Sequence, residues 1–306
     1  MTTNNPPVSR RGVLIALIGT VIWAMTGVFI DYLLGHYPLA PLTLAFWRDL
    51  FASLALFALL ALWRPRYLRI SRRDLPFLFL FGSGILALFN ALWTFSVKFN
   101  GGAVGTVLAY SSPAFIVLLA KPLLGEQLTP RRLVAVALSL TGCVLVSRAY
   151  SPDAWQVNPL GIAIGLASGI AFAIYTLTGR WGERRFPNPI TMMPYGFLFA
   201  ALTLGLLAIT TAPPAGLFSL GTRWDGWGIL ALLAVGPTIG GYGLYAVSMR
   251  YLEASVAGLI ASLEPAFTAV MALFVLGRWL DLEQWGGTAL ILAAVVIVQT
   301  SGKVKT

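Results

Sequence analysis

Long apolar runs separated by short polar connections fill almost the whole chain. The hydrocarbon core of a bilayer needs about 20 consecutive apolar residues in helical form, because no water is present there to satisfy bare backbone groups. Ten runs meet that requirement, and we place them at 12–34, 41–63, 75–97, 103–124, 133–147, 159–179, 190–211, 226–249, 255–276 and 284–301. The pattern therefore predicts an all-α integral membrane protein with ten transmembrane helices, and its short connections leave no room for a soluble domain.

The basic residues are divided unequally between the two sides of these predicted helices. Sixteen fall on the side of the N-terminus: Arg10, Arg11, Arg64, Arg66, Arg69, Arg72, Arg73, Lys121, Arg131, Arg132, Arg180, Arg184, Arg185, Arg250, Lys303 and Lys305. Four fall on the other side: Lys98, Arg148, Arg223 and Arg278. Cytoplasmic loops carry an excess of Lys and Arg, so both termini, including the tail 1–11, are expected in the cytoplasm. The net charge of +10 is thus a topology signal, and no nucleic-acid partner is expected.

The composition excludes several classes of protein. Hydrophobic residues make up 58% and charged residues 10% of the 306 positions, whereas a soluble domain carries about 25% charge. Cys143 is the only cysteine and His36 the only histidine, which leaves no intrachain disulfide and no clustered Cys/His metal site, and no cofactor is expected. The apolar run after Arg11 is too long for the core of a signal peptide, so it is interpreted as a retained first span.

The chain contains an internal repeat. A shift of 152 positions aligns AVGTVLAYSSPAF (103–115) with SVAGLIASLEPAF (255–267), and it places Pro113 on Pro265. Shifts of 149 and 148 align the first span with the sixth and the second with the seventh. The two units are 12–148 and 159–301. Each holds five helices, and because five is odd, the second must be inserted upside down relative to the first, the arrangement of many alternating-access carriers. The alternative is a duplicated membrane scaffold without transport.

The paired motifs ending in SSPAF and LEPAF resemble the EamA-type repeat of the drug/metabolite transporter superfamily. Gly125, Glu126 and Leu128 are similar to the motif that closes the family's repeat, whereas the second copy has Arg278 at the position of Glu126, so a structural role at a helix end is expected for Glu126. The resemblance implies a ten-helix carrier of the bacterial inner membrane, working as a monomer and similar to exporters of aromatic and other neutral amino acids. Carriers of cationic drugs, nucleosides and nucleotide sugars share this fold and remain alternatives.

Two prolines mark predicted helix breaks in the fourth and ninth spans. Pro113 and Pro265 each remove a backbone donor and free the carbonyl four residues earlier, that of Ala109 or Ala261. Polar side chains stand beside both breaks, where they could contact a solute: Tyr110, Ser111, Ser112 and Glu264. The alternative is that both prolines only kink packed helices.

Aromatic residues with polar neighbours occupy matching faces of the third and eighth spans. Phe89, Asn90, Trp93 and Thr94 share one face at i, i+3 and i+4 spacing, and the repeat places Tyr242 on Asn90 and Tyr245 on Trp93. Such a wall suits an amphiphilic solute, and Trp23 and Tyr175 could complete it. The alternative is that these rings belong to the interfacial belt or to helix packing.

Arg48 and Glu264 are charged residues well inside predicted spans. Arg48 is a candidate for contact with a substrate carboxylate, or else forms a salt bridge or reaches the outer headgroups. Adjacent helical residues point about 100° apart, so Asp49 need not pair with it. Glu264 is a candidate proton carrier or cation contact, or else a hydrogen-bonded structural residue.

No enzyme motif is found in the sequence. The G-x-x-x-x-G-K-[ST] loop of a nucleotide-driven pump is absent, as is the H-E-x-x-H motif of a metalloprotease. The single His36 lies in a connection, which argues against a serine-type intramembrane protease. The chain also lacks the pair of intramembrane Asp residues that an aspartyl type needs. A channel or a receptor would need a carbonyl filter or a ligand domain. We therefore expect a secondary transporter of small metabolites.

Overall fold

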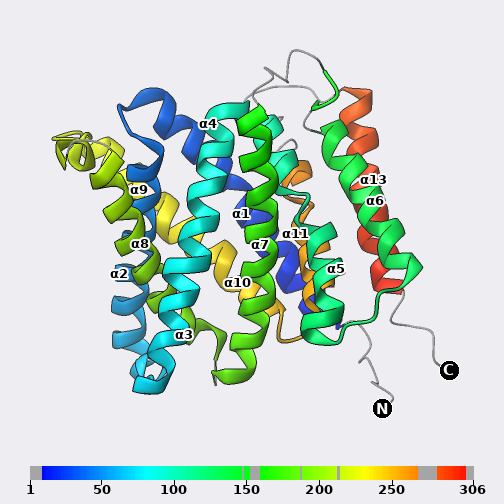
Figure 1. The fold of residues 1–306 in the computed structure, drawn as a ribbon, viewed down its shortest axis with the longest axis horizontal. Helices are drawn as coiled ribbons and strands as arrows, with labels where there is room; N and C mark the ends of the chain where they lie inside the picture. The colour runs from blue at the N-terminus through cyan, green and yellow to red at the C-terminus, as the bar shows by residue number, and fades with distance from the viewer. Residues whose placement is uncertain are drawn as a thin grey trace.

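The computed structural model describes residues 9–146, 148–151, 159–186, 188–211, 214–267 and 281–300, and this part of the chain contains helices and no strand. The elements in chain order are α1 (Arg10–His36), α2 (Pro41–Trp63), η1 (Pro65–Leu68), η2 (Arg72–Asp74), α3 (Leu75–Phe79), η3 (Leu80–Leu86), α4 (Ala87–Ala109), α5 (Ser112–Leu124), α6 (Pro130–Val146), α7 (Pro159–Arg185), η5 (Pro189–Thr191), α8 (Met192–Thr211), η6 (Pro214–Phe218), α9 (Trp224–Leu233), η7 (Ala234–Ile239), α10 (Gly240–Ser248), α11 (Ala254–Ala261) and α13 (Leu282–Thr300). Figure 1 shows the long helices side by side, running between the two ends of the molecule.

Several helices have the length and composition of membrane spans. Six such helices occur among the described residues: Arg10–His36, Pro41–Trp63, Arg72–Phe99, Pro159–Gly182, Met192–Thr211 and Trp224–Ser248. Three shorter apolar helices accompany them: Ser112–Leu124, Ala254–Phe267 and Leu282–Ile297. Part of the predicted ninth span, 268–276, lies outside the described residues.

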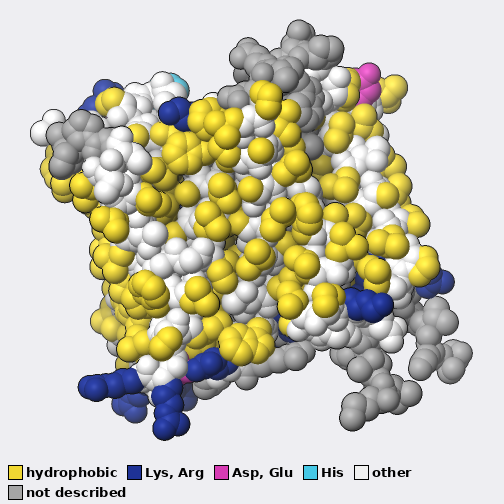
Figure 2. Space-filling view, in the orientation of Figure 1, with side chains coloured by type: hydrophobic (Ala, Val, Ile, Leu, Met, Phe, Trp, Pro, Cys, Tyr) yellow, Lys and Arg dark blue, Asp and Glu magenta, His cyan; other side chains and the backbone are white. Residues whose placement is uncertain are grey.

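The outer surface is apolar in the middle and basic at one end. Figure 2 shows a broad band of hydrophobic side chains, with Lys and Arg gathered mainly at the end of the molecule that lies at the bottom of the view. The connection after α2 contributes Arg64, Arg66, Arg69, Arg72 and Arg73, all exposed, and we call this end the basic face. Exposed leucines on the long helices suit contact with lipid chains.

The predicted turn between the third and fourth spans is present, although helical hydrogen bonding continues through it. A Cβ built on Gly105 would lie 3.1 Å from the Cα of Val97, whereas residues eight apart in a straight helix are separated by about 12 Å. The chain therefore reverses direction within α4.

The third and eighth spans each contain a wide π turn, at η3 and η7. With the shift of 152, the segment 80–86 falls on 232–238, so the two wide turns overlap in the alignment. π turns are rare and are frequent at functional sites. The apolar pattern of the sequence did not predict either turn.

Close backbone contacts join helices from the two halves. Gly142 of α6 faces Gly287 of α13, and a Cβ on either residue would lie within 2.6–2.7 Å of the other residue's carbonyl oxygen. Small residues allow this approach, a common way of packing helices in membranes.

Candidate functional site

Two helix breaks frame the centre of the bundle. The backbone leaves the helix at Tyr110–Ser111, where the Ser111 amide donates to the Leu108 carbonyl at 3.2 Å. The equivalent amide of the second half, that of Leu263, donates to the Ile260 carbonyl at 3.1 Å. The chain therefore turns in the same way at both predicted breaks.

Pro113 starts a helix instead of kinking one. It lies in the first turn of α5, where a missing N–H leaves no hydrogen bond unmade. Pro265 follows the second break at the same spacing. In both halves the backbone leaves the helix two residues before the proline. That these prolines serve the transport path remains a prediction.

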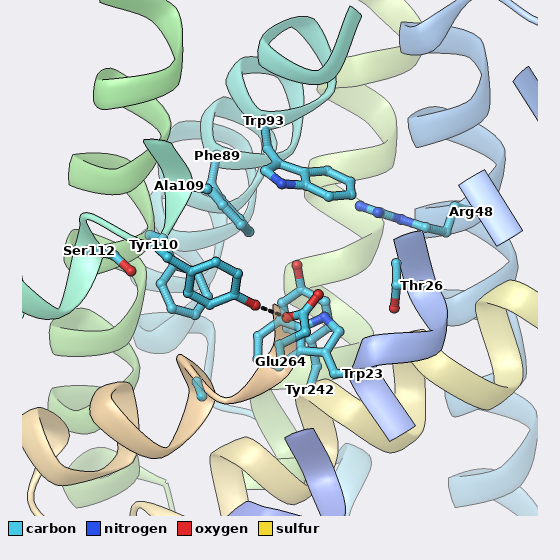
Figure 3. A pocket seen from close by; sticks show the side chains of 12 residues that line it. Trp23, Thr26, Arg48, Phe89, Trp93, Ala109, Tyr110, Ser112, Tyr242 and Glu264 are labelled. Atoms are coloured by element: carbon cyan, nitrogen blue, oxygen red, sulfur yellow. Dashed lines mark hydrogen bonds between the residues drawn. The ribbon is translucent and has the colours of Figure 1, made fainter. Parts of the chain in front are cut away.

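A central cavity lies beside both breaks (Figure 3). Its volume, including the solvent space at its open side, is about 560 Å³. Its walls are Trp23, Thr26, Arg48, Phe89, Trp93, Ala109, Tyr110, Ser112, Phe172, Tyr242, Ala261 and Glu264. These residues come from α1, α2, α4, α5, α7, α10, α11 and the two helix breaks, so both halves of the chain build the cavity.

Most of the residues predicted to contact a solute lie together in this cavity. The ones that line it are Trp23, Arg48, Phe89, Trp93, Tyr110, Ser112, Tyr242 and Glu264. Asn90, Ser111, Tyr175 and Tyr245 do not line it. Ser111 instead donates to the Leu108 carbonyl at 2.6 Å, and the Tyr245 hydroxyl lies 3.0 Å from that of Thr176. Whether the lining residues bind substrate remains a prediction.

Sequence reasoning missed Thr26 and Phe172 as lining residues. Phe172 is the repeat mate of Trp23, so the alignment held a signal that could have found it. Thr26 is a single small polar residue in an apolar run, and its type gave no sign of its position. Ala109 and Ala261, predicted to expose backbone carbonyls, both line the cavity.

Arg48 and Asp49 form a buried ion pair, in line with the salt-bridge alternative for Arg48. The Arg48 Nε donates to Asp49 Oδ1 at 3.1 Å, and the two side chains are only 2% and 0% exposed. The other Asp49 oxygen accepts from Asn90 Nδ2 at 2.7 Å, and the Asn90 oxygen accepts from the Tyr242 hydroxyl at 3.4 Å. Four side chains thus form a chain of polar contacts behind the cavity wall.

Two donors at one end of the cavity have no hydrogen-bond acceptor within the described part of the chain. They are Arg48 Nη2 and Thr26 Oγ1, and both are buried. Arg48 Nη2 lies 3.1 Å from Asp49 Oδ1 but does not form a hydrogen bond with it. Figure 3 shows the Arg48 guanidinium extending toward Trp93, with Thr26 beside it. A buried donor without an acceptor is costly, and both residues line the cavity, so a bound solute could satisfy them.

Glu264 provides a carboxylate in the same cavity. It accepts a short hydrogen bond from the Tyr110 hydroxyl, which joins the first helix break to the second (Figure 3). The cavity therefore offers donors on Arg48 and Thr26 and an acidic group on Glu264.

Aromatic rings form the wall between these polar groups. Trp23 lies with its ring centroid 4.6 Å from Tyr242 and 5.7 Å from Phe172, and Phe89 lies 5.0 Å from Phe172. Ring pairs at these separations attract one another and present flat apolar faces.

Polar contacts hold the helix ends opposite the basic face. The Tyr37 hydroxyl donates to Asp225 Oδ2 at 2.5 Å, a hydrogen bond that raises the pKa of Tyr37 to about 12. The Arg223 guanidinium lies over the Tyr37 ring at 4.9 Å. The connection between α1 and α2 is thereby tied to the start of α9.

Glu126 acts at a helix end, the role that the resemblance led us to expect. Its carboxylate accepts from the Ala254 amide at 2.9 Å and from the Ser255 hydroxyl at 2.5 Å. These groups begin α11, so a residue of the first half caps a helix of the second. Arg132 bridges Glu126 at 3.6 Å and also pairs with Glu253. Arg278, the counterpart of Glu126, lies outside the described residues.

Comparison with known proteins places this architecture among transporters. The sequence matches the EamA-like transporter family over residues 10–148 and again over 159–300. It is 27% identical to the uncharacterized transporter YwfM of Bacillus subtilis, covering 94% of this chain and 93% of that protein. It is 26% identical to the uncharacterized inner membrane transporter YicL of Salmonella typhimurium, covering 96% and 97%.

A solved crystal structure has the same fold. It superposes with a TM-score of 0.79 at 18% sequence identity, covering 97% of this chain and 100% of the other. The family match extends over both halves and the relatives are similar along their whole lengths, so the chain belongs to the EamA-like transporter family and is a multi-pass membrane transporter.

Proposed function

We propose that this transporter exports small metabolites, namely aromatic and other neutral amino acids, across the bacterial inner membrane, and that the central cavity is its substrate site. The observation that carries the proposal is the joint presence of unsatisfied donors, a carboxylate and aromatic walls in one cavity. An amino acid brings a carboxylate, an ammonium group and an apolar side chain, and it can engage all three kinds of group at once.

In this binding mode the substrate carboxylate meets Arg48 and Thr26, and the ammonium group meets Glu264. Arg48 is already neutralised by Asp49, so the cavity holds no net positive charge to attract a plain anion. A zwitterion fits this balance better than a carboxylic acid without an amine.

We further propose ten spans arranged as two inverted repeats that work by alternating access. A pseudo-two-fold axis allows two kinds of helix contact. A helix can pack against its own repeat mate, or a contact between two helices can be repeated between the mates of those helices. Two packed pairs join mates, α2 with α8 and α6 with α13, and the contact of α5 with α11 joins two different parts of the aligned spans 103–124 and 255–276. The other two major pairs, α1 with α10 and α4 with α7, exchange into one another under the repeat shift. The matching π turns and helix breaks agree with this axis.

The cytoplasmic location of the basic face is also a proposal. It rests on the sixteen-to-four division of Lys and Arg between the two sides. The relative from Salmonella is named an inner membrane transporter, which fits the proposed location.

The test is counterflow of radiolabelled L-phenylalanine into liposomes that contain the purified protein. We expect uptake by the wild type, and a loss of at least about tenfold for Trp93→Ala and Arg48→Ala when both variants elute as folded protein. Wild-type uptake by both variants would rule out the central cavity as the substrate site. A parallel series with and without a pH gradient distinguishes facilitated diffusion from proton antiport.

Organic cations are the second candidate substrates, because Glu264 places a carboxylate in the aromatic cavity. Tryptophan, tryptamine and indole-3-propionate share one ring and differ in charge, so competition by each against labelled phenylalanine separates the two candidates. Strong competition by tryptamine alone favours the cation carrier, whereas competition by tryptophan alone favours the amino-acid carrier.

A further inference from the structure

A second cavity lies between α7, α8, α10 and the turn η3, separate from the central cavity. Its walls are Phe81, Leu86, Tyr175, Gly179, Met192, Met193, Gly196, Phe197, Ala246 and Met249. Its volume, including the solvent space at its open side, is about 410 Å³. The walls are almost wholly apolar and include three methionines, whose flexible side chains adapt to differently shaped apolar groups.

The ring of Tyr175 forms a partition between the two cavities. Its centroid lies 5.7 Å from Tyr242, 5.9 Å from Phe172 and 6.4 Å from Phe89, all of which line the central cavity. On its other side it lies 5.4 Å from Phe81, which lines the second cavity.

One face of α7 runs from the central cavity toward the basic face. Phe172, Tyr175, Gly179, Gly182 and Phe186 follow one another at spacings of three or four residues, so they share a face. Phe172 and Gly179 are about 10 Å apart along the axis at 1.5 Å per residue. The central cavity, the Tyr175 partition and the second cavity therefore lie in series along this helix.

The end of this series is closed near the basic face. The Phe77 ring lies 5.0 Å from Trp181 and 6.1 Å from Phe186. Arg185 donates to Asp74 at 2.8 Å and lies over the Phe77 ring at 5.6 Å. An aromatic cluster and an ion pair thus separate the second cavity from the basic face.

We propose that the second cavity is an additional substrate site on the path between the central cavity and the basic face, and that it holds the apolar side chain of the transported solute. The inference rests on the proposed function. The lining explains the class of ligand, because its rings and thioethers suit an apolar group, none of the wall residues is charged, and the Tyr175 hydroxyl is the only polar side-chain group among them. The solute passes two barriers, the Tyr175 ring and the closure around Phe77, Arg185 and Asp74.

Gly179 allows this cavity to be filled without damage to the backbone. A Cβ added there would lie 3.5 Å from Met249 Cε, an ordinary van der Waals contact, so a larger side chain at this position extends into the cavity. Gly228 of α9 provides the matched control, because its surroundings are exposed and no atom lies within 4 Å of an added Cβ.

The experiment compares the wild type with Gly179→Leu and Gly228→Leu, measuring equilibrium binding of tritiated L-phenylalanine in detergent and its counterflow in liposomes. For Gly179→Leu we expect binding within about threefold of the wild type and counterflow reduced at least about tenfold, because the central cavity is intact and the path is blocked. Gly228→Leu should match the wild type in both measurements. Ala246→Leu fills the same cavity from α10 and replaces Gly179→Leu if that variant does not elute as folded protein.

Wild-type counterflow by a folded cavity-filling variant would overturn the second site while leaving the proposed function intact. Loss of binding together with transport would also overturn it, since the two cavities would then not be separate sites. Absence of both binding and counterflow in the wild type would instead overturn the proposed function, and the second site with it.

Discussion

Arg48 is a buried cation whose charge is balanced by its neighbour in the chain. The two Cα–Cβ directions of adjacent helical residues differ by about 100°, yet the long arginine side chain folds back and reaches the carboxylate at 3.1 Å. The directions of Cβ vectors therefore do not decide the partners of a side chain with four rotatable bonds. Asn90 of α4 donates to the second oxygen of the Asp49 carboxylate, so a neighbouring helix also holds the ion pair of α2 in place.

Removal of the Asp49 charge should destabilise the protein strongly. Asp49→Asn leaves the buried Arg48 without a counter-ion, and the expected loss is about 3–5 kcal/mol in the free energy of unfolding. The double variant Arg48→Met with Asp49→Leu removes both charges and should unfold closer to the wild type, although it should not transport. Unfolding by titrated SDS measures both. Equal loss in the single and double variants would contradict the ion-pair interpretation.

Thr26 is expected to matter for binding and not for folding. Its hydroxyl finds no acceptor among the described residues, so Thr26→Val keeps the shape and removes no observed hydrogen bond. We expect unchanged thermal stability and substrate affinity lowered about threefold to tenfold, equivalent to about 0.5–1.5 kcal/mol. Thr20→Val is the control for replacing a threonine whose hydroxyl already has an acceptor. Thr20 donates to the Ala16 carbonyl at 2.8 Å within its own helix. An unchanged affinity for Thr26→Val would remove it from the site.

At the scale of single residues, the sequence indicated which residues lie near the cavity better than it indicated which contacts they make. Of the matched positions Asn90/Tyr242 and Trp93/Tyr245, only one residue of each pair lines the cavity. Tyr175 was expected in the same wall but lies between two cavities, since its ring points a turn farther along α7. Nothing in the type of residue distinguishes these two positions.

At the scale of elements, helix ends were easier to predict than irregularities within helices. The second span, predicted at 41–63, coincides with α2, because Pro41 fixes the start and polar residues follow the end. The wide turns η3 and η7 leave the apolar pattern almost unchanged, so that pattern did not predict them, although Pro237 in η7 and the Gly82–Gly84 run in η3 are residues that favour irregular helix.

Gly125 controls how α5 ends. Its φ of 73° lies in the left-handed region, and its amide donates to the Lys121 carbonyl at 3.1 Å. Gly125→Ala should cost about 1–2 kcal/mol and displace Glu126 from the start of α11. Gly125→Asn should cost less, because asparagine tolerates this conformation. Thermal unfolding in detergent compares the two, and equal stability of Gly125→Ala and wild type would contradict the prediction.

An ion pair joins the end of α6 to the start of α13. Arg148 pairs with Asp281, and the Gln284 amide also donates to the Asp281 carboxylate at 2.8 Å. The backbone amide of Gln284, followed by Arg148, holds the pKa of Asp281 below its usual value.

Because the folded-state pKa of Asp281 is lowered, its contribution to stability is present above the usual pKa of an aspartate and is lost as the pH falls through the lowered pKa. The difference in melting temperature between wild type and Asp281→Asn should therefore be largest near neutral pH and shrink toward pH values of about 3. A difference that stays constant over this range would contradict the role of the carboxylate charge.

At the scale of the whole molecule, the sequence predicted an all-helical membrane protein and the family match supports that class. The division of basic residues further predicts that the two ends of the bundle face different compartments. The packed pairs of helices could not be derived from the sequence, since apolar helices carry little information about which neighbour they contact.

Labelling with a membrane-impermeant thiol reagent tests the sidedness. In a Cys143→Ser background, Arg69→Cys should react only from the cytoplasmic side and Thr222→Cys only from the outside, since both positions are exposed at opposite ends. Intact cells and inside-out vesicles provide the two orientations. Labelling of both positions from one side would disprove the odd number of crossings per half.

The paired wide turns also bear on the history of the protein. Each turn accommodates about one residue more than a regular α-helical turn, and each sits a few residues before a side chain that lines the cavity, Phe89 in one half and Tyr242 in the other. Two independent insertions at one aligned position are a less economical explanation than a single insertion inherited twice. If the two halves descend from one gene, as the proposed repeat requires, the extra residue was present before that gene was duplicated.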